Sequence, residues 1–318
     1  MRNVRGNLTD GAKDEIEHDP DGFERHMSVV RSEATAKTYA KGVRKFIEFL
    51  EEVDSPLEKA PRGFLGDFVT WMSAKEGLSA STLGLFSVAV RRYLDWMRDR
   101  GAPVPEFKTP DVPKIVDADV KVLSEQQIDI YIGLIAKEIH EPTRTALMLL
   151  PFTGMRSLEM CSLKMEHIKR QTDDKGKPFA LFRFPGKGQK SRLVPVAKRG
   201  EKILTEYLLS YRNSFPHKNI YLFPGYIKGS HLPTRTMRSD VEYIRKLMGV
   251  PFLTAHTLRK TYASELSKQG FAIQYIAKVL GHSSINTTNQ HYLNIPDEEL
   301  IKMRRVKIGS DRERTTNR

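Results

Sequence analysis

The chain has 318 residues, which is long enough for two domains that each bury a hydrophobic core. Its 52 lysines and arginines exceed its 39 aspartates and glutamates, a formal net charge of +13, so we expect an anionic partner, with nucleic acid ahead of a membrane surface or an acidic protein. The single cysteine, Cys161, excludes an intrachain disulfide and a cysteine-based zinc site, and no segment reads as a membrane span or signal peptide, so we expect a cytoplasmic protein without membrane contact.

The N-terminal region divides into a charged tail and the beginning of a helix. Residues 1–22 hold three basic and six acidic residues and hardly any large apolar side chain, so we expect a flexible tail. From about Ser32 the pattern changes. Large apolar residues then recur at steps of four, three and four, as the apolar stripe of an amphipathic helix does. These residues are Tyr39, Val43, Phe46 and Leu50.

Two further helices are expected before residue 103. One begins at Pro61, because proline suits the first turn of a helix, and continues to Met72. The next begins after the cap residue Ser79 and ends near Gly101, since glycine adopts the left-handed conformation that closes many helices at the lowest cost. Residues 23–103 are therefore predicted to form a small all-helical domain.

A proline-rich segment separates this domain from the rest of the chain. Four of the eleven residues from 103 to 113 are prolines, which prevents a continuous helix, so residues 104–120 are predicted to form an extended linker. The second domain, residues 121–300, begins with Ser124 and Gln127. Their side chains can each cap the other's backbone N–H group, which predicts the start of a helix.

The second domain is predicted to be mostly helical with two short strands, Phe179–Phe184 and Arg192–Val196, joined by a loop. A last helix is possible over Asp297–Val306, because it follows Pro296 directly. The remainder, residues 301–318, carries mostly basic charge and is expected to be a mobile tail unless it docks on a partner. The fold class expected is mainly α with a small antiparallel β-sheet in the second domain.

Five short motifs of the second domain carry candidate chemistry. Taken singly, each has an ordinary explanation: an arginine after a glycine turn is usually a surface ion-pair partner, a lysine between glycines a hairpin tip, and a tyrosine a partly buried aromatic residue. A histidine and an arginine three residues apart lie on one face of a helix and can reach one ligand. The motifs are Thr153–Met160 with Arg156 and Glu159, Gly186–Gly188 with Lys187, His256–Arg259, Leu280–His282, and His291–Tyr292.

In order and spacing, these motifs resemble the catalytic domain of the tyrosine recombinase, or phage integrase, family. An arginine with a glutamate three residues later is followed by a hairpin lysine, His-x-x-Arg, Leu-Gly-His and a tyrosine ten residues beyond that histidine. The resemblance covers about residues 25–300, because the first domain and linker also look like the family's core-binding, SAM-like domain. The segment between His282 and Tyr292 is one residue longer than in many Xer-type members.

The resemblance implies that Tyr292 is the nucleophile, which joins DNA through a 3′-phosphotyrosyl bond. Arg156 and Arg259 would bind the scissile phosphate, since each guanidinium presents a planar fork of donors and stays charged. Glu159 is expected to hold basic side chains in place, because a free carboxylate would repel the phosphate. The ordinary alternative for Glu159 is a surface glutamate.

The remaining motif residues complete the implied chemistry. Lys187 would protonate the leaving 5′ oxygen as the general acid. His256 and His282 would hydrogen-bond the nonbridging oxygens, and His256 is the best candidate to accept the proton of Tyr292. Because cationic side chains take the place that Mg²⁺ occupies in many phosphoryl-transfer enzymes, we expect no metal, no ATP and no other cofactor.

The resemblance also implies how the protein assembles. Its two domains would close around double-stranded DNA as a C-shaped clamp, and a homotetramer or heterotetramer would act on two DNA sites with paired half-sites. The helix over Asp297–Val306 would dock on the neighbouring subunit, and accessory proteins can take part. The biological role would be integration and excision of a mobile element or resolution of replicon dimers.

Two other functions remain open at this level. A type IB topoisomerase uses a similar set of residues but relaxes supercoils as a monomer; the helical first domain and the short segment from His282 to Tyr292 favour the recombinase. A DNA-binding regulator that has lost catalysis is the other alternative. Every expected catalytic position is filled, which argues against that loss.

Overall fold

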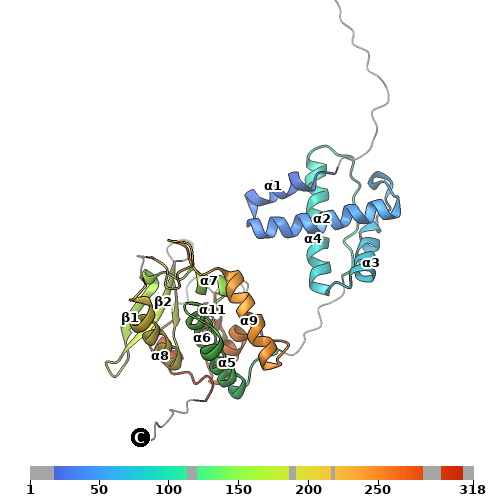
Figure 1. Ribbon diagram of the computed structural model, residues 1–318. Coiled ribbons are helices and arrows are strands. Elements are labelled where there is room, and N and C mark those ends of the chain that lie inside the picture. The colour runs from blue at the N-terminus through green and yellow to red at the C-terminus, as the bar shows by residue number, and fades with distance from the viewer. Residues whose placement is uncertain (1–17, 113–119, 186–190, 216–218, 282–294, 311–318) are drawn as a thin grey trace, which may run out of the picture. The chain divides into compact units, whose positions relative to one another are not determined.

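The computed structural model describes residues 18–112, 120–185, 191–215, 219–281 and 295–310. The chain forms two compact units, Met1–Ala118 and Asp119–Arg318 (Figure 1). The mainly α class with one small antiparallel sheet is confirmed. The C-shaped clamp concerns how the two units sit relative to one another and stays a prediction.

The described part of the first unit is built from α-helices around an aromatic core. Ser32 and Ser79 cap two of them, since each serine hydroxyl accepts a hydrogen bond from the backbone N–H three residues later. Phe46, Phe68 and Tyr93 are almost completely buried between the helices. The helices are α1 (Pro20–Val30), α2 (Glu33–Val53), α3 (Phe64–Glu76) and α4 (Ala80–Asp99), with a 3-10 turn, η1 (Leu57–Lys59).

The structure differs from the expected N-terminal tail at its end. The Asp19 carboxylate accepts a hydrogen bond from the Gly22 N–H at 2.7 Å and so caps α1. Phe23 and Met27 bury one face of this helix against the core. The sequence pattern missed α1 because it has only two buried residues. Residues 1–17 of the expected tail lie outside the described residues.

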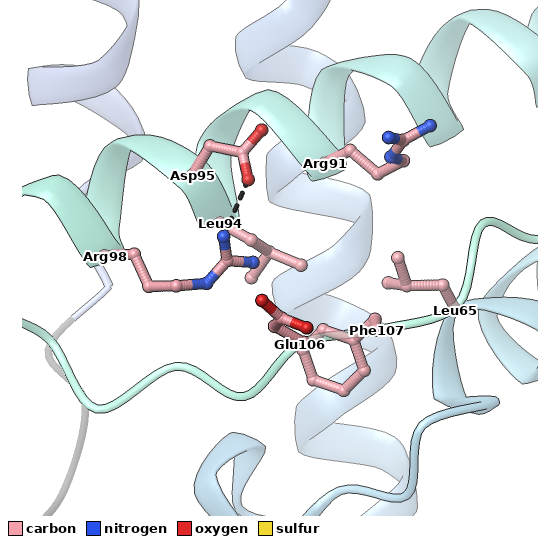
Figure 2. Close-up of a pocket in the computed structure, with 7 residues that line it drawn as sticks. All are labelled: Leu65, Arg91, Leu94, Asp95, Arg98, Glu106 and Phe107. Carbon is pink, nitrogen blue, oxygen red and sulfur yellow. Dashed lines mark hydrogen bonds and ion pairs between the residues drawn. The ribbon is translucent and has the colours of Figure 1, made fainter.

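The helix expected from Pro61 begins three residues later, at Phe64, because residues 61–63 form a turn that Gly63 ends. After α4 the chain runs on without regular structure to residue 112, and it lies against the first unit. Val104 is buried, and Lys108 N–H donates to the Arg62 carbonyl at 2.8 Å. A cavity of about 170 Å³ lies there, between this segment and α4 (Figure 2). It is lined by Leu65, Arg91, Leu94, Asp95, Arg98, Glu106 and Phe107.

The second unit packs helices around α6, most of whose residues are buried. The capping box predicted at Ser124 and Gln127 is confirmed: Gln127 N–H donates to the serine hydroxyl at 3.2 Å, and Ser124 N–H donates to the glutamine side chain at 3.0 Å. The described helices are α5 (Glu125–Glu138), α6 (Thr143–Thr153), α7 (Ser157–Cys161), α8 (Lys198–Tyr207), α9 (Thr234–Met248), α10 (Ala255–Lys268), α11 (Ile273–Leu280) and α12 (Asp297–Arg304), with a 3-10 turn, η2 (Met165–His167), and a π turn, η4 (Leu208–Arg212).

One antiparallel sheet of three strands lies on this unit, in the order β1 (Ile168–Thr172), β2 (Pro178–Pro185) and β3 (Ser191–Pro195). The two predicted strands are confirmed as β2 and β3, and Phe182 pairs with Val194 in their register. The pattern missed β1, because three of its five residues are Lys, Arg and Gln and show no alternation of apolar side chains.

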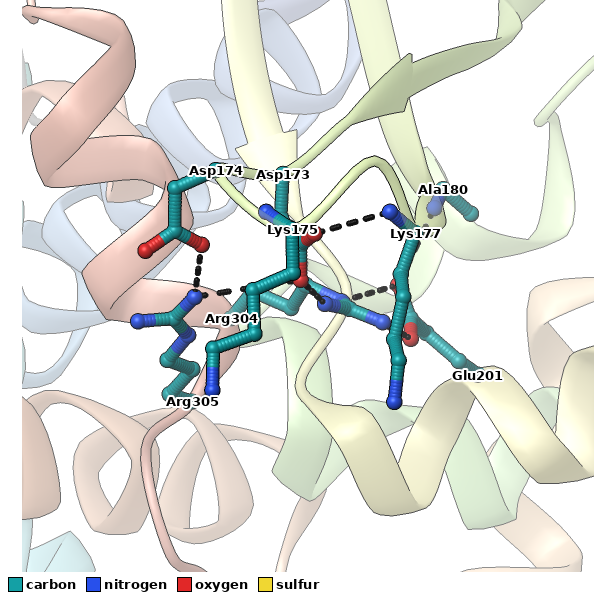
Figure 3. A network of polar contacts seen from close by, with 8 residues as sticks. All are labelled: Asp173, Asp174, Lys175, Lys177, Ala180, Glu201, Arg304 and Arg305. Atoms are coloured by element: carbon teal, nitrogen blue, oxygen red, sulfur yellow. Dashed lines mark hydrogen bonds and ion pairs between the residues drawn. The ribbon is translucent and has the colours of Figure 1, made fainter.

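The expected basic tail from residue 301 is wrong for residues 301–310. Met303, Val306 and Ile308 are buried in the core of the second unit, and α12 packs against β3 of its own unit. The prediction followed the basic charge, but acidic partners on this unit match it. Arg304 Nη1 lies 2.9 Å from Asp173 Oδ2 and its Nη2 2.9 Å from Glu201 Oε2 (Figure 3). Residues 311–318 lie outside the described residues.

Truncating Ile308 to alanine is expected to lower the free energy of unfolding of the second unit by about 2 to 5 kcal/mol, because it leaves a cavity in the core. Chemical denaturation of the full chain measures this loss. Ile227→Ala, at a side chain 76% exposed, is the matched control and should change little. Equal stability of both variants would mean that the segment after α12 does not pack in this way.

Candidate functional site

The site is built where α6 ends. Gly154 closes this helix with φ +61°, and a Cβ atom there would lie 2.4 Å from the ring of Tyr262 and 2.7 Å from the side chain of Leu280. Both the left-handed backbone and the close packing therefore require glycine. The turn at Gly154 places Arg156 at the start of α7.

Two arginines converge on the end of α11. Arg259, on α10, is 3% exposed and donates from Nη1 to the Gly154 carbonyl at 2.8 Å and from Nη2 to the Leu280 carbonyl at 2.6 Å. Arg156 donates from Nη2 to the Gly281 carbonyl at 2.8 Å. The last carbonyls of a helix carry the negative end of its dipole, so they stabilise both cations. Two guanidiniums of like charge are thus held side by side.

Burial, and after it the positive charge of Arg156, lower the pKa of Arg259 to about 10. The side chain nevertheless stays protonated at neutral pH. The structure therefore concentrates positive charge at this point, although burying these charges is unfavourable for folding. Such a concentration is typical of a site that binds an anion.

Glu159 links this pair to the sheet. Its carboxylate accepts the Arg156 backbone N–H at 2.9 Å and Arg156 Nη1 at 3.0 Å, and it lies 2.9 Å from Arg192 Nη2. Burial raises the pKa of this carboxyl, but contact with Arg192 and then Arg156 lowers it more, so the pKa lies below its usual range. Glu159 is therefore ionised at neutral pH.

His256 lies in the first turn of α10, one helical turn before Arg259. Thr254 caps this helix by accepting the Thr257 N–H at 3.0 Å. Partial burial lowers the pKa of His256, and the charges of Lys260, Arg259 and Arg156 lower it in the same direction. The imidazole is therefore mostly neutral at pH 7 and can accept a proton.

The structure brings Arg156, Glu159 and Arg259 together around the end of α11, with His256 on the helix of Arg259. The other three predicted site residues, Lys187, His282 and Tyr292, lie outside the described residues.

Arg192 contacts Glu159 but belongs to none of the five motifs. The sequence pattern indicated only that Arg192 begins the predicted strand Arg192–Val196. The one signal was a charged residue directly before the apolar pair Leu193 and Val194.

Among the described residues, no group of three or more histidines, cysteines and carboxylates could hold a metal ion. None of the helices that the structure describes is long and apolar enough to cross a membrane.

Comparison with known proteins agrees in both halves of the chain. Residues 121–299 match the phage integrase family, and residues 21–101 match the N-terminal SAM-like domain of phage integrases. The tyrosine recombinase XerC of Corynebacterium glutamicum is 30% identical over 288 residues, which cover 89% of each chain. A tyrosine recombinase of Thermosipho africanus is 28% identical and covers 87% of this chain and 95% of its own.

Solved structures share the fold. The recombinase XerH bound to its difH substrate superposes with a TM-score of 0.62 at 23% identity, covering 85% of this chain and 80% of XerH. A lambda integrase tetramer bound to a Holliday junction gives a TM-score of 0.63 at 16% identity, covering 87% of this chain and 79% of that one. The family matches, and the 30% identity to XerC over most of both chains, show that this chain belongs to the phage integrase family of tyrosine recombinases, enzymes that break and rejoin DNA strands.

Proposed function

We propose that this protein recombines DNA at specific sites through Tyr292, with Arg156 and Arg259 as the phosphate-binding pair. The observation that carries the proposal is the pair of guanidiniums held by the carbonyls of Gly154, Leu280 and Gly281. A phosphodiester is singly charged and gathers further negative charge as a nucleophile attacks it. Two fixed cations therefore bind the transition state more tightly than the substrate.

The nucleophile needs to lose a proton at neutral pH. A phenol with a pKa near ~10 is mostly protonated there, so Tyr292 requires a base or a cationic surrounding. His256 is the proposed base, because its lowered pKa keeps it neutral. Attack by the Tyr292 oxygen forms the bond to the 3′ phosphate and breaks the bond to the 5′ oxygen.

The leaving 5′ oxygen needs a proton, and Lys187 is the proposed donor. His282 is proposed to bind a nonbridging oxygen beside the arginine pair. The phosphotyrosyl bond retains the energy of the phosphodiester. The 5′ hydroxyl of the other cleaved DNA can therefore attack this bond, release Tyr292 and rejoin the strands without ATP. Neither step calls for a metal ion, because the cations of the site balance the developing charge.

The proposed substrate is double-stranded DNA with paired half-sites, gripped by both units as a C-shaped clamp. XerH was solved on its difH substrate and lambda integrase as a tetramer on a Holliday junction, which supports a tetramer on two DNA sites here. The excess of positive charge supports binding to the DNA backbone, and it makes the affinity depend strongly on salt. Integration and excision of a mobile element, or resolution of replicon dimers, is the proposed biological role.

A nicked suicide substrate tests the function. The protein is incubated with such substrates prepared from fragments of its own replicon, and a covalent complex that survives denaturation is sought. A tetramer that exchanges strands supports the recombinase. Relaxation of supercoils by a monomer without strand exchange would favour a topoisomerase, and specific binding without a covalent complex would favour a regulator.

The proposed role of His256 predicts a pH dependence. Cleavage should persist at a pH equal to the usual pKa of histidine and fall only at lower pH. The reason is that the base must be neutral and the pKa of His256 lies below the usual value. Lys260→Gln removes one positive neighbour, so the acidic limb of the rate profile should move to higher pH. Single-turnover cleavage across a pH series measures this shift. Lys268→Gln, at the far end of α10, is the control, and identical profiles for both variants would exclude His256 as the base.

A further inference from the structure

We propose that Arg192 is a positioning residue of the same site: it holds Glu159, and through Glu159 it fixes Arg156 for phosphate binding. The inference rests on the proposed function, because a positioning role has meaning only where Arg156 binds the scissile phosphate. It adds a residue on the sheet to a site whose other described members lie on helices or at their ends.

The surroundings of Arg192 hold its guanidinium in one place. Its Nη2 lies 2.9 Å from Glu159 Oε2, and its side chain is only 17% exposed. The guanidinium also lies over the ring of Phe184, 4.9 Å from its centre, and Phe184 is its cross-strand partner in the register of β2 and β3. A cation that contacts both a ring face and a carboxylate has few alternative rotamers.

Gly281 makes room for this arrangement. A Cβ atom at this position would lie 2.0 Å from Arg192 Nη1, so any other residue would displace the arginine. The carbonyl of the same glycine accepts the hydrogen bond from Arg156 Nη2 at 2.8 Å. Arg192, Glu159, Arg156 and Gly281 therefore form one connected cluster in which a movement of Arg192 displaces the others.

The charges of the cluster give Arg192 a second effect. Glu159 is a carboxylate close to the place where a phosphate would bind, and it would repel that phosphate if it were not neutralised. Arg156 cannot serve both groups fully, because its guanidinium also faces the carbonyls at the end of α11. Arg192 supplies the second positive charge, so Glu159 can hold Arg156 without weakening anion binding.

The position of Arg192 on β3 also connects the site to the hairpin. Ser191 pairs with Pro185 at the end of the register, and Arg192 pairs with Phe184 in the next position. Lys187, the proposed general acid, belongs to the segment that joins these strands. Fixing Arg192 on Glu159 therefore fixes the start of β3 relative to the arginine pair.

The test compares Arg192→Gln, Arg192→Lys, Glu159→Gln and the double variant Arg192→Gln/Glu159→Gln. We expect R192Q to slow single-turnover cleavage by about 10- to 100-fold, as loss of an orienting contact commonly does. DNA affinity should change by less than about 3-fold, because Arg192 contacts Glu159 and is proposed to act through it and not on the phosphate. R192K keeps the charge without the planar fork and should lie between R192Q and the wild type.

Two readouts separate positioning from folding. R192Q and E159Q should not add, so the double variant should cleave no more slowly than the slower single variant. In R192Q, burial would act on Glu159 with one cation fewer, so the pKa of Glu159 should rise. Below the pH at which His256 limits the rate, cleavage by R192Q should then fall more steeply than cleavage by the wild type.

Arg199 offers a matched control. Its Nη1 lies 2.5 Å from Asp129 Oδ1, its guanidinium lies 5.7 Å from the ring centre of Phe152, and a Cβ atom at residue 309 would lie 2.5 Å from its Nη1. It thus has the same kinds of contact as Arg192 without touching Arg156 or Glu159. Arg199→Gln should leave the cleavage rate per folded molecule unchanged.

The outcomes are distinct. A wild type that forms no covalent complex removes the proposed function and this inference with it. If the wild type forms the complex and R192Q cleaves as fast as R199Q, only the positioning role of Arg192 is contradicted. The same holds if the defects of R192Q and E159Q add and the pH profile of R192Q is that of the wild type. If R192Q loses its melting transition, R192K decides by the same criteria.

Discussion

Replacing Tyr292 with phenylalanine is expected to abolish the covalent protein–DNA complex and strand exchange, by at least about 10³-fold in rate, because no other group replaces a lost nucleophile efficiently. Binding to DNA should remain within about 2-fold, since the change removes one oxygen and no charge. The covalent complex on a suicide substrate and an electrophoretic binding assay measure the two effects separately.

Tyr275→Phe is the control for this prediction. Tyr275 lies on α11, whose end contacts the two arginines, and it has none of the proposed catalytic roles, so the variant should form the complex at the wild-type rate. A complex that forms in Y292F at the wild-type yield would place the nucleophile on another tyrosine. Peptide mapping of the labelled DNA adduct would then identify that residue.

The sequence predicted the helices with strong periodicity and clear caps, and it failed where few residues carry the pattern. The helix over Glu33–Val53 buries eight residues between Ala36 and Leu50, whereas α1 buries only Phe23 and Met27. The strand β1 is polar because only one of its edges pairs with the sheet and much of it is exposed. A short, half-exposed element leaves too little trace in the order of residue types.

The C-terminal segment shows a different limit. Its basic charge predicted a tail, but the buried side chains of Met303, Val306 and Ile308 determine its position. Arg304 belongs to the fold because it forms ion pairs with Asp173 and Glu201, which only the structure shows. Charge pairing between segments that lie more than a hundred residues apart cannot be read from composition.

The candidate site shows the same division. The order of motifs was enough to select Arg156, Glu159 and Arg259, because each stands in a spacing that few unrelated sequences share. Arg192 has no such spacing, and its contact with Glu159 depends on how β3 lies against the start of α7. The motifs therefore predicted the proposed phosphate-binding pair and Glu159, whereas Arg192 could be found only from the packing.

Replacing Arg259 with lysine is expected to lower the cleavage rate by about 10² to 10³-fold, the loss that follows removal of one fixed donor from a developing oxyanion. The two guanidinium nitrogens of Arg259 reach the carbonyls of Gly154 and Leu280 at the same time. An ammonium group is a single point of charge and cannot span both carbonyls and still present a donor to phosphate. Single-turnover cleavage at saturating DNA measures this loss.

Stability should fall in the same variant, because at least one buried carbonyl loses its donor, at a cost of about 1 to 3 kcal/mol. Arg183→Lys, at an exposed position of β2, is the control and should leave both cleavage and unfolding unchanged. The rate must therefore be compared at a temperature where both variants are fully folded. If R259K then cleaves at the wild-type rate, positive charge alone is sufficient at this position and the planar fork of Arg259 serves only the fold. If R259K cleaves slowly, the geometry that joins two backbone carbonyls also presents the guanidinium to the phosphate.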